Sequence, residues 1–101
     1  MDAITRFEAQ REALAEFCRQ NRIRKLSVFG SALREDFNEE SDVDLLVEFE
    51  PGQSPGLAFY SMADDLRVIF GRPVDFLTER GLNRHIRAKV LREAQPLYDA
   101  A

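Results

Sequence analysis

The sequence contains few of the side chains from which disulfides and zinc sites are built. Among its 101 residues there is one cysteine, Cys18, and one histidine, His85. A lone cysteine excludes an internal disulfide, and a histidine with no second histidine or cysteine partner does not make a zinc site. Cys18 falls among the apolar positions of a predicted helix and is interpreted as a buried structural thiol in a reducing compartment. His85 stands beside Arg84 and is interpreted as a surface residue.

Long apolar runs and an excess of positive charge are missing as well. No segment approaches the ~20 apolar residues of a membrane span, and the start MDAITRFEAQ lacks the basic and apolar regions of a signal peptide. These absences predict a cytoplasmic protein without a membrane segment. Because 14 basic residues stand against 18 acidic ones, the net charge is -4, and binding to long nucleic acid is not expected. The length and a hydrophobic content of 45% predict one globular domain over residues 1–101.

Apolar spacing and turn residues divide the chain into alternating helices and strands. The predicted elements are a helix over 3–20, a strand over 25–30, a short helix over roughly 32–36, a strand over 42–49, a helix from about 54 to 71, a strand over 73–78 and a helix from 82 to about 94, before Pro96. This order predicts an α/β fold in which helices cover a small sheet. Since many functions share such layouts, the function has to be inferred from a site.

The stretch SDVDLLVEF, residues 41–49, places two aspartates at alternate positions where an apolar strand begins. Side chains at positions i and i+2 share one face of a strand, so Asp42 and Asp44 would present two carboxylates side by side. Like charges this close repel each other, and a divalent cation between them relieves the repulsion. The alternative is that Ser41 and Asp42 only cap a turn.

Two further features belong to the same candidate site. Asp75 lies near the start of the predicted strand PVDFLT and stands beside the pair if the two strands are neighbours, which gives three carboxylates around a metal. Gly30 and Ser31 end the first predicted strand, where a glycine allows close backbone approach and free N–H groups attract phosphate oxygens. Taken alone, Asp75 is typical of a surface residue that begins a strand, and Gly-Ser is typical of a turn.

Together these residues form a specific pattern. Gly30 and Ser31, nine intervening residues and then SDVDLLV resemble the signature of the DNA polymerase β nucleotidyltransferase superfamily, and most of all its small bacterial branch, the minimal nucleotidyltransferases (MNT). The resemblance runs from VFGS through FGRPVDFLT to VLREAQPLY. It implies a small mixed sheet flanked by helices, and transfer of a nucleoside monophosphate with release of pyrophosphate.

The resemblance also implies roles for individual residues. Metal-binding and catalytic roles fall on Asp42, Asp44 and Asp75, and nucleotide-binding roles fall on Gly30, Ser31 and Ser41. The aspartates would ligate two Mg²⁺ ions, and Asp75 would also help to deprotonate the attacking hydroxyl. The Gly-Ser turn would hold the triphosphate of ATP. Two metal ions in such a site stabilise both the attacking and the leaving oxygens of an in-line displacement.

The same resemblance implies a partner. Proteins of this branch commonly act as antitoxins of helical HEPN ribonuclease toxins, and members transfer AMP from ATP to a tyrosine of that toxin. A core of this size leaves little room for a domain that grips an acceptor, so the acceptor is expected to bring its own binding energy. The first hypothesis is therefore a protein adenylyltransferase antitoxin. The alternatives are a non-catalytic antitoxin that neutralises the toxin by binding, and nucleotidyl transfer to a small molecule or an RNA end.

The sequence departs from the family pattern after the Gly-Ser turn. Many relatives carry a second glycine four residues after the serine, where this chain has Glu35, so the following helix is expected to be more regular. Arg34 either reaches a phosphate or pairs with a neighbouring acid. The basic residues near the end of the chain form either a solvated helical face or a docking surface for an acidic partner or RNA; they are Arg80, Arg84, Arg87, Lys89 and Arg92.

Overall fold

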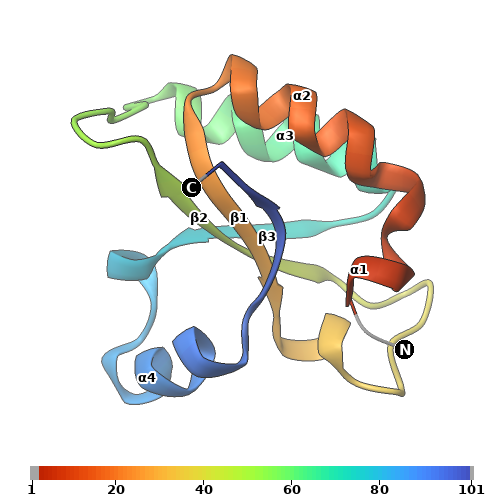
Figure 1. Cartoon of the computed structure of the whole chain (residues 1–101). Coiled ribbons are helices and arrows are strands. Elements are labelled where there is room, and N and C mark those ends of the chain that lie inside the picture. Colours follow the sequence, from red (N-terminus) through yellow and green to blue (C-terminus); the bar gives the residue numbers. More distant parts are fainter. Residues whose placement is uncertain (1–2, 101) are drawn as a thin grey trace.

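A computed structural model describes residues 3–100 and contains one four-stranded sheet (Figure 1). The helices are α1 (Ala3–Arg6), α2 (Arg11–Gln20), α3 (Ala58–Phe70) and α4 (Arg84–Glu93), and the strands are β1 (Ile23–Phe29), β2 (Val43–Phe49), β3 (Val74–Thr78) and β4 (Gln95–Asp99). Three short 3-10 segments are η1 (Glu8–Gln10), η2 (Gly30–Leu33) and η3 (Glu79–Gly81). The sheet order is β3-β2-β1-β4, with β2 parallel to β3 and the other two pairs antiparallel, which confirms the mixed sheet.

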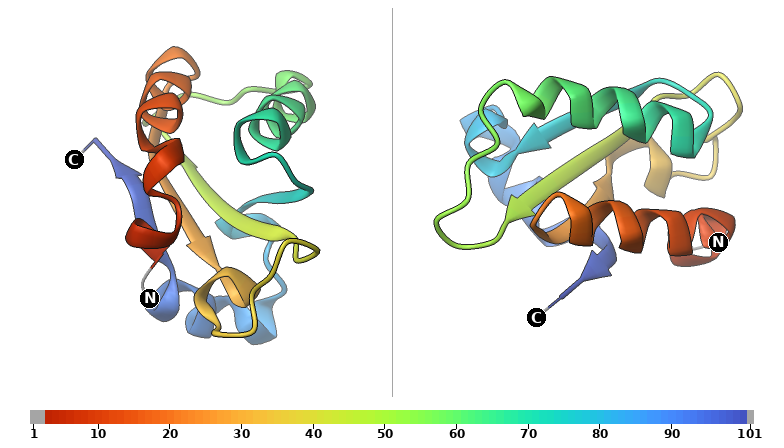
Figure 2. Two further views of the ribbon diagram at one scale, coloured as in Figure 1. Left: turned by 90° about the vertical axis from the view of Figure 1, so that its right-hand side faces the viewer. Right: turned by 90° about the horizontal axis from the view of Figure 1, so that it is seen from above.

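The helices cover the two faces of the sheet unequally. Figure 2 shows α2 and α3 over one face and α4 on the opposite side. In β2, Val43, Leu45 and Val47 are buried in the main core, which lies under α2 and α3. Leu46 packs instead in a smaller cluster with residues of α4. Because alternate residues of a strand share a face, Asp44 lies on the α4 side of the sheet.

The prediction of one continuous helix over 3–20 is wrong, because the segment forms two helices. Phe7 leaves the helical conformation, with φ −110° and ψ 26°, and a 3-10 turn separates α1 from α2. The ring of Phe7 is buried and makes edge contacts with Phe37 and Phe70, at centroid distances of 5.9 and 5.3 Å. Packing against these two distant rings therefore decides the backbone at a position where the apolar spacing alone predicts a helix.

The predicted short helix over 32–36 is also wrong. The chain forms the 3-10 segment η2 over Gly30–Leu33, and Arg34 returns to an extended conformation with φ −98° and ψ 156°. Residues 34–42 contain no helix or strand. A helix more regular than in the family, as expected from Glu35, is therefore absent from this segment.

The sequence prediction missed β4 and misjudged α4. Pro96 was expected only to close the last helix, but it lies within β4, opposite Ser27 of β1. Proline lacks an N–H donor and is tolerated because β4 is an edge strand with a single neighbour. In α4 only Val90 is buried, whereas Ile86 and Leu91 are exposed although their spacing predicts a core position.

The other elements are confirmed with small changes of boundary. The strands predicted over 25–30, 42–49 and 73–78 correspond to β1, β2 and β3. Helix α3 begins at Ala58, later than expected, because the backbone of 55–58 forms a turn in which the Ala58 N–H donates to the Pro55 carbonyl at 3.2 Å. It ends as predicted at Gly71, which takes the left-handed conformation with φ 68°. Every helix within residues 3–100 is too short or too polar to cross a bilayer.

Candidate active site

Asp44 of β2 and Asp75 of β3 are brought together by the parallel pairing of these strands. The register places Asp44 directly beside Asp75, with Val43 beside Val74. The proximity of Asp75 opposes ionisation of Asp44 and raises its pKa. The neighbouring strands that the sequence prediction required for three converging acids are therefore present.

Asp44 titrates at an unusually high pH for an aspartate. Partial burial, the hydrogen bond to Asp75 and the negative charges of Asp75 and Asp42 together raise the pKa of Asp44 to about 6. A hydrogen bond from the backbone N–H of Ser31 acts in the opposite direction and lowers this pKa. Strongly raised pKa values with specific charged neighbours are common at functional sites.

Asp42 is exposed and precedes the first residue of β2. Its backbone carbonyl accepts a hydrogen bond from the Ser31 hydroxyl at 3.1 Å, and its negative charge reaches Asp44. Across residues 3–100, no three His, Cys, Asp or Glu side chains are yet gathered tightly enough to hold a metal ion. Repulsion among the carboxylates of Asp42, Asp44 and Asp75 opposes a tighter cluster in the absence of a cation. Their oxygen atoms are the hard donors that Mg²⁺ prefers.

Gly30 and Ser31 approach Asp44 closely. Gly30 has a φ of +66°, and a Cβ atom at this position would overlap Oδ2 of Asp44, so only glycine fits both the conformation and the space. The backbone N–H of Ser31 lies toward the Asp44 carboxylate and lowers its pKa. A phosphate at this turn would have to displace that carboxylate oxygen or use other donors.

Two other candidates have local partners. Ser41 caps a turn: its hydroxyl accepts the Asn38 N–H at 3.1 Å, and its own N–H donates to the Asn38 carbonyl at 3.0 Å. The side chain that was assigned to nucleotide binding thus has the capping role that the sequence left open. Arg34 pairs with Asp36 at 3.2 Å, as one of its two interpretations expects, and both side chains are exposed.

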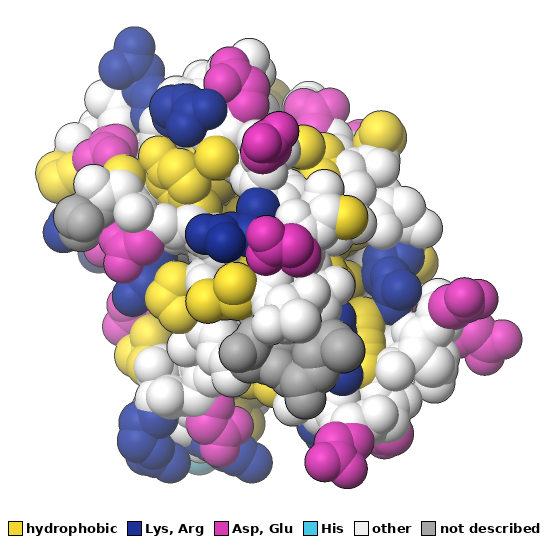
Figure 3. Space-filling view, turned by 45° about the vertical axis from the view of Figure 1, so that its right-hand side comes forward, with side chains coloured by type: hydrophobic (Ala, Val, Ile, Leu, Met, Phe, Trp, Pro, Cys, Tyr) yellow, Lys and Arg dark blue, Asp and Glu magenta, His cyan; other side chains and the backbone are white. Residues whose placement is uncertain are grey.

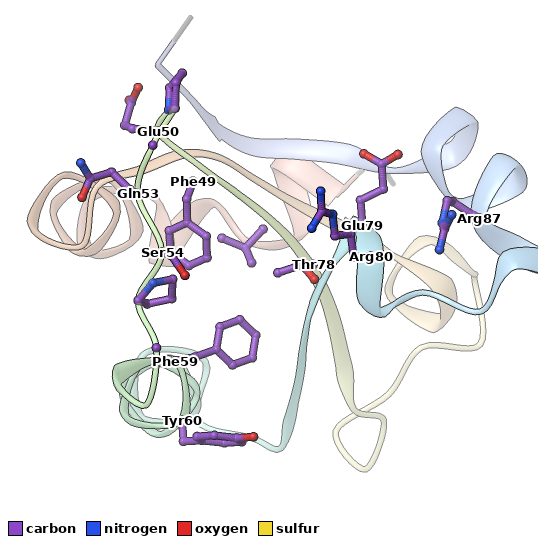
Figure 4. A pocket seen from close by; sticks show the side chains of 15 residues that line it. Phe49, Glu50, Gln53, Ser54, Phe59, Tyr60, Thr78, Glu79, Arg80 and Arg87 are labelled. Atoms are coloured by element: carbon purple, nitrogen blue, oxygen red, sulfur yellow. The ribbon is translucent and has the colours of Figure 1, made fainter.

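A groove of about 950 Å³ opens at the other end of β2. Phe49 and Phe59 point into it, Tyr60 lies at its rim, and Arg80 and Arg87 come from the opposite wall (Figure 4). Asp44 and Phe49 are five residues apart on β2, which corresponds to roughly 16 Å at about 3.3 Å per residue. The groove is therefore separate from the aspartate cluster, and the sequence analysis did not predict it.

The charges of the surface are mixed. Figure 3 shows acidic and basic side chains interspersed over the face that it presents. His85 is exposed on α4, as predicted, and Cys18 is completely buried. Burial raises the pKa of the Cys18 thiol to about 12, so this cysteine is a structural core residue.

Sequence reasoning missed two residues that contact the loop of the site. Arg6 donates to the backbone carbonyls of Ala32 and Arg34, and Arg72 donates to those of Asn38 and Ser41. These contacts join residues 26 to 34 positions apart. No local pattern in a single sequence signals such a contact, because it depends on how the elements pack.

Comparison with known proteins identifies relatives. Residues 11–97 match the family model of the nucleotidyltransferase domain. The protein adenylyltransferase MntA of Thermococcus cleftensis is 39% identical over 71 residues, which cover 70% of this chain and 71% of that protein. A Methanocaldococcus jannaschii protein, provisionally named a protein adenylyltransferase, is 35% identical over 72 residues, which cover 71% of this chain and 76% of the relative.

Solved structures share the fold. One, described provisionally as a minimal nucleotidyltransferase, is 41% identical, covers 95% of this chain and 96% of its own, and has a TM-score of 0.73. A toxin-antitoxin structure with AMP-PNP is 19% identical over 88% of this chain and 73% of that chain, with a TM-score of 0.70. A complex of a tri-AMPylated Shewanella oneidensis HEPN toxin with an MNT antitoxin is 18% identical over 92% and 72%, with a TM-score of 0.66. At these low identities the last two show the fold alone.

Proposed function

This chain belongs to the nucleotidyltransferase domain family as a minimal nucleotidyltransferase, and we propose that it transfers AMP from ATP to a tyrosine of a HEPN-family toxin. The observation that carries the proposal is the meeting of Asp44, Asp75 and the Gly30–Ser31 turn at one end of β2. The names of the relatives support AMP as the group and a protein as the acceptor.

Asp42, Asp44 and Asp75 are the proposed ligands of two Mg²⁺ ions. The fit rests on three hard oxygen donors and on the raised pKa of Asp44, which shows that negative charge is poorly compensated at this site. Bound Mg²⁺ would neutralise the triphosphate and stabilise the charges that develop on the attacking and leaving oxygens.

The remaining chemistry falls to the side chains of this protein. The tyrosine oxygen attacks the α-phosphorus of ATP, the bond from this phosphorus to the bridging oxygen breaks, and pyrophosphate leaves with the electron pair. The tyrosine proton passes to the carboxylate of Asp75, which is exposed and can return it to solvent. Above about pH 6 Asp44 is ionised and is available as a metal ligand.

The Gly30–Ser31 turn is the proposed phosphate site. Gly30 lets the backbone pass close to the Asp44 carboxylate, which brings the turn and the acids together. The Ser31 hydroxyl, which donates to the Asp42 carbonyl, is a further donor close to the acids. Residues 1–101 are proposed to act as one domain, and the toxin supplies the surface that presents its tyrosine.

The experiment is intact mass spectrometry of a HEPN-family toxin incubated with this protein, ATP and Mg²⁺. The toxin is expected to gain the mass of one or more adenylyl groups, and peptide mapping should place them on tyrosine. Asp44→Asn should abolish the gain, whereas Asp65→Asn, an exposed aspartate of α3, should leave it unchanged. Efficient transfer to an aminoglycoside or an RNA end, with the toxin unmodified, would refute the proposed acceptor.

A further inference from the structure

The loop over residues 34–42 joins the two halves of the proposed active site. Ser31 lies just before it, in η2, and Asp42 is its last residue, immediately before β2. The loop contains no helix or strand and has only a few internal backbone bonds, such as that from the Ser41 N–H to the Asn38 carbonyl. The Ser31 hydroxyl donates directly to the Asp42 carbonyl at 3.1 Å, and contacts from outside the loop add to this bond in holding the two residues in register.

Two arginines from distant segments make such contacts. Nη1 of Arg6 donates to the Ala32 carbonyl at 2.6 Å and to the Arg34 carbonyl at 3.0 Å. Nη1 of Arg72 donates to the Asn38 carbonyl at 2.8 Å and to the Ser41 carbonyl at 3.2 Å. Arg6 thus holds the beginning of the loop, beside the Gly-Ser turn, and Arg72 holds its end, beside Asp42. Hydrogen bonds from a charged donor are stronger than neutral ones.

Phe37 links the two arginines. Its ring centroid lies 5.0 Å from the guanidinium carbon of Arg6 and 4.5 Å from that of Arg72, which are cation–π distances. The ring also contacts Phe7 of the core edge-on. Arg6, Phe37 and Arg72, here called the arginine clamp, therefore form one cluster that ties the loop to the folded core.

The clamp also connects the loop to β3. Arg72 precedes Pro73, whose carbonyl accepts the N–H of Val43 at 3.0 Å, so the chain before β3 is bonded to the first residue of β2. Asp42 directly precedes Val43, and Asp75 follows Pro73 by two residues. Loss of Arg72 should therefore loosen Asp42 relative to Asp75, whereas loss of Arg6 should loosen Ser31.

We propose that Arg72 and Arg6 are positioning residues with separate effects: Arg72 sets the affinity for Mg²⁺ through Asp42, and Arg6 sets the affinity for ATP through the Gly30–Ser31 turn. The inference rests on the proposed function. Both guanidinium groups donate to backbone carbonyls and stack on Phe37, so their role is to fix the loop. Outer residues that orient metal ligands commonly change metal affinity by about 10- to 100-fold.

The experiment compares Arg72→Gln, Arg6→Gln and the control Arg67→Gln, whose exposed side chain pairs with Asp64 of the same helix. We expect Arg72→Gln to raise the Mg²⁺ concentration for half-maximal AMP transfer by about 10- to 100-fold, with a smaller change in the KM for ATP. Arg6→Gln should instead raise the KM for ATP, with a smaller change in the Mg²⁺ concentration for half-maximal transfer. Arg72→Lys should restore the Mg²⁺ affinity only in part, since lysine lacks the planar group that stacks on Phe37 while it donates to the backbone carbonyls.

Hydrogen exchange of the unliganded proteins provides a readout that does not depend on activity. Amides of residues 34–42 should exchange faster in both clamp variants and at the wild-type rate in Arg67→Gln. Phe37→Leu, which keeps an apolar side chain but removes the ring between the guanidiniums, is the second variant if an arginine substitution fails to fold. Phe37→Leu should moderately lower the affinity for both Mg²⁺ and ATP.

The outcomes distinguish this inference from the proposed function. If the wild type transfers AMP and the clamp variants share its Mg²⁺ dependence and KM, the positioning role is wrong while the function stands. Equal losses in Arg67→Gln would also overturn it. If the wild type transfers no AMP, the proposed function fails, and titration of Mg²⁺ with AMP-PNP, followed by thermal unfolding, still decides whether the clamp sets affinity.

Discussion

Asp44 and Asp75 lie directly beside each other on the adjacent parallel strands β2 and β3. Two carboxylates in this arrangement cannot both ionise without cost, and the pKa of Asp44 rises to about 6. The pair is a source of local instability in the metal-free protein. A bound divalent cation would remove this electrostatic repulsion between the two carboxylates.

The pH dependence of stability follows from this pKa. Below about pH 4 Asp44 is protonated in both the folded and unfolded states and contributes nothing. Between about pH 4 and 6 the folded state holds the proton more tightly, so the free energy of unfolding falls as the pH rises, and the full loss is present above pH 6. The size is roughly 1 kcal/mol after allowing for solvent screening of this half-exposed group.

Asp44→Asn is therefore expected to unfold at a higher denaturant concentration than wild type at pH 7 without metal, and at a similar one near pH 4. Urea titrations at the two pH values measure the difference. Asp65→Asn, exposed on α3, is the control and should track wild type at both. A wild type more stable than Asp44→Asn at pH 7 would contradict the raised pKa.

Binding of Mg²⁺ with AMP-PNP should stabilise wild type by mass action. At a concentration 100 times the dissociation constant the gain is about 2.7 kcal/mol, which corresponds to several degrees in melting temperature for a domain of this size. Asp44→Asn should lose most of the shift. Because Mg²⁺ competes with the proton of Asp44, the shift in wild type should also shrink below about pH 6. An equal shift in the mutant would place the metal elsewhere.

Gly30→Ala should disrupt the site through Asp44. The added Cβ would meet Asp44 Oδ2 and also suffer the strain of a positive φ. Gly56→Ala is a matched control, because Gly56 has a φ of +59° and nothing within 4 Å of a Cβ atom. We expect Gly30→Ala to lose at least about 1 kcal/mol more unfolding free energy than Gly56→Ala. Adding Asp44→Ala to Gly30→Ala should recover that excess in stability, but not AMP transfer.

Asp75→Asn separates catalysis from simple binding of the toxin. The amide keeps the size of the side chain and removes the charge that binds metal and accepts the proton, so transfer should slow by about 100- to 10,000-fold. Growth of cells that co-express the toxin, together with its AMP content, gives the measurement. Rescue of growth by a mutant that leaves the toxin unmodified would establish that binding alone neutralises it. Loss of rescue, with the two proteins still purifying together, would establish that chemistry is needed.

The sequence by itself determined the three strands that carry the site and the glycine that ends α3. The spacing of apolar residues in β2 and the turn at Gly71 predict these elements because their causes are local: period-two burial and the left-handed conformation of glycine. The Gly-Ser and Asp-x-Asp pattern likewise marked Asp42 and Asp44 as candidates. Asp75 could be named, but its place beside Asp44 stayed conditional.

Only the tertiary structure decided the contacts between segments distant in the chain. The parallel pairing that sets Asp75 beside Asp44, the edge position that admits Pro96 into β4, and the break at Phe7 each depend on packing partners far away in sequence. The arginine clamp is the strongest case, because Arg72 acts on carbonyls more than 30 positions away. Local propensity fixes which residues can form a site, whereas the packing of the whole chain fixes which of them meet.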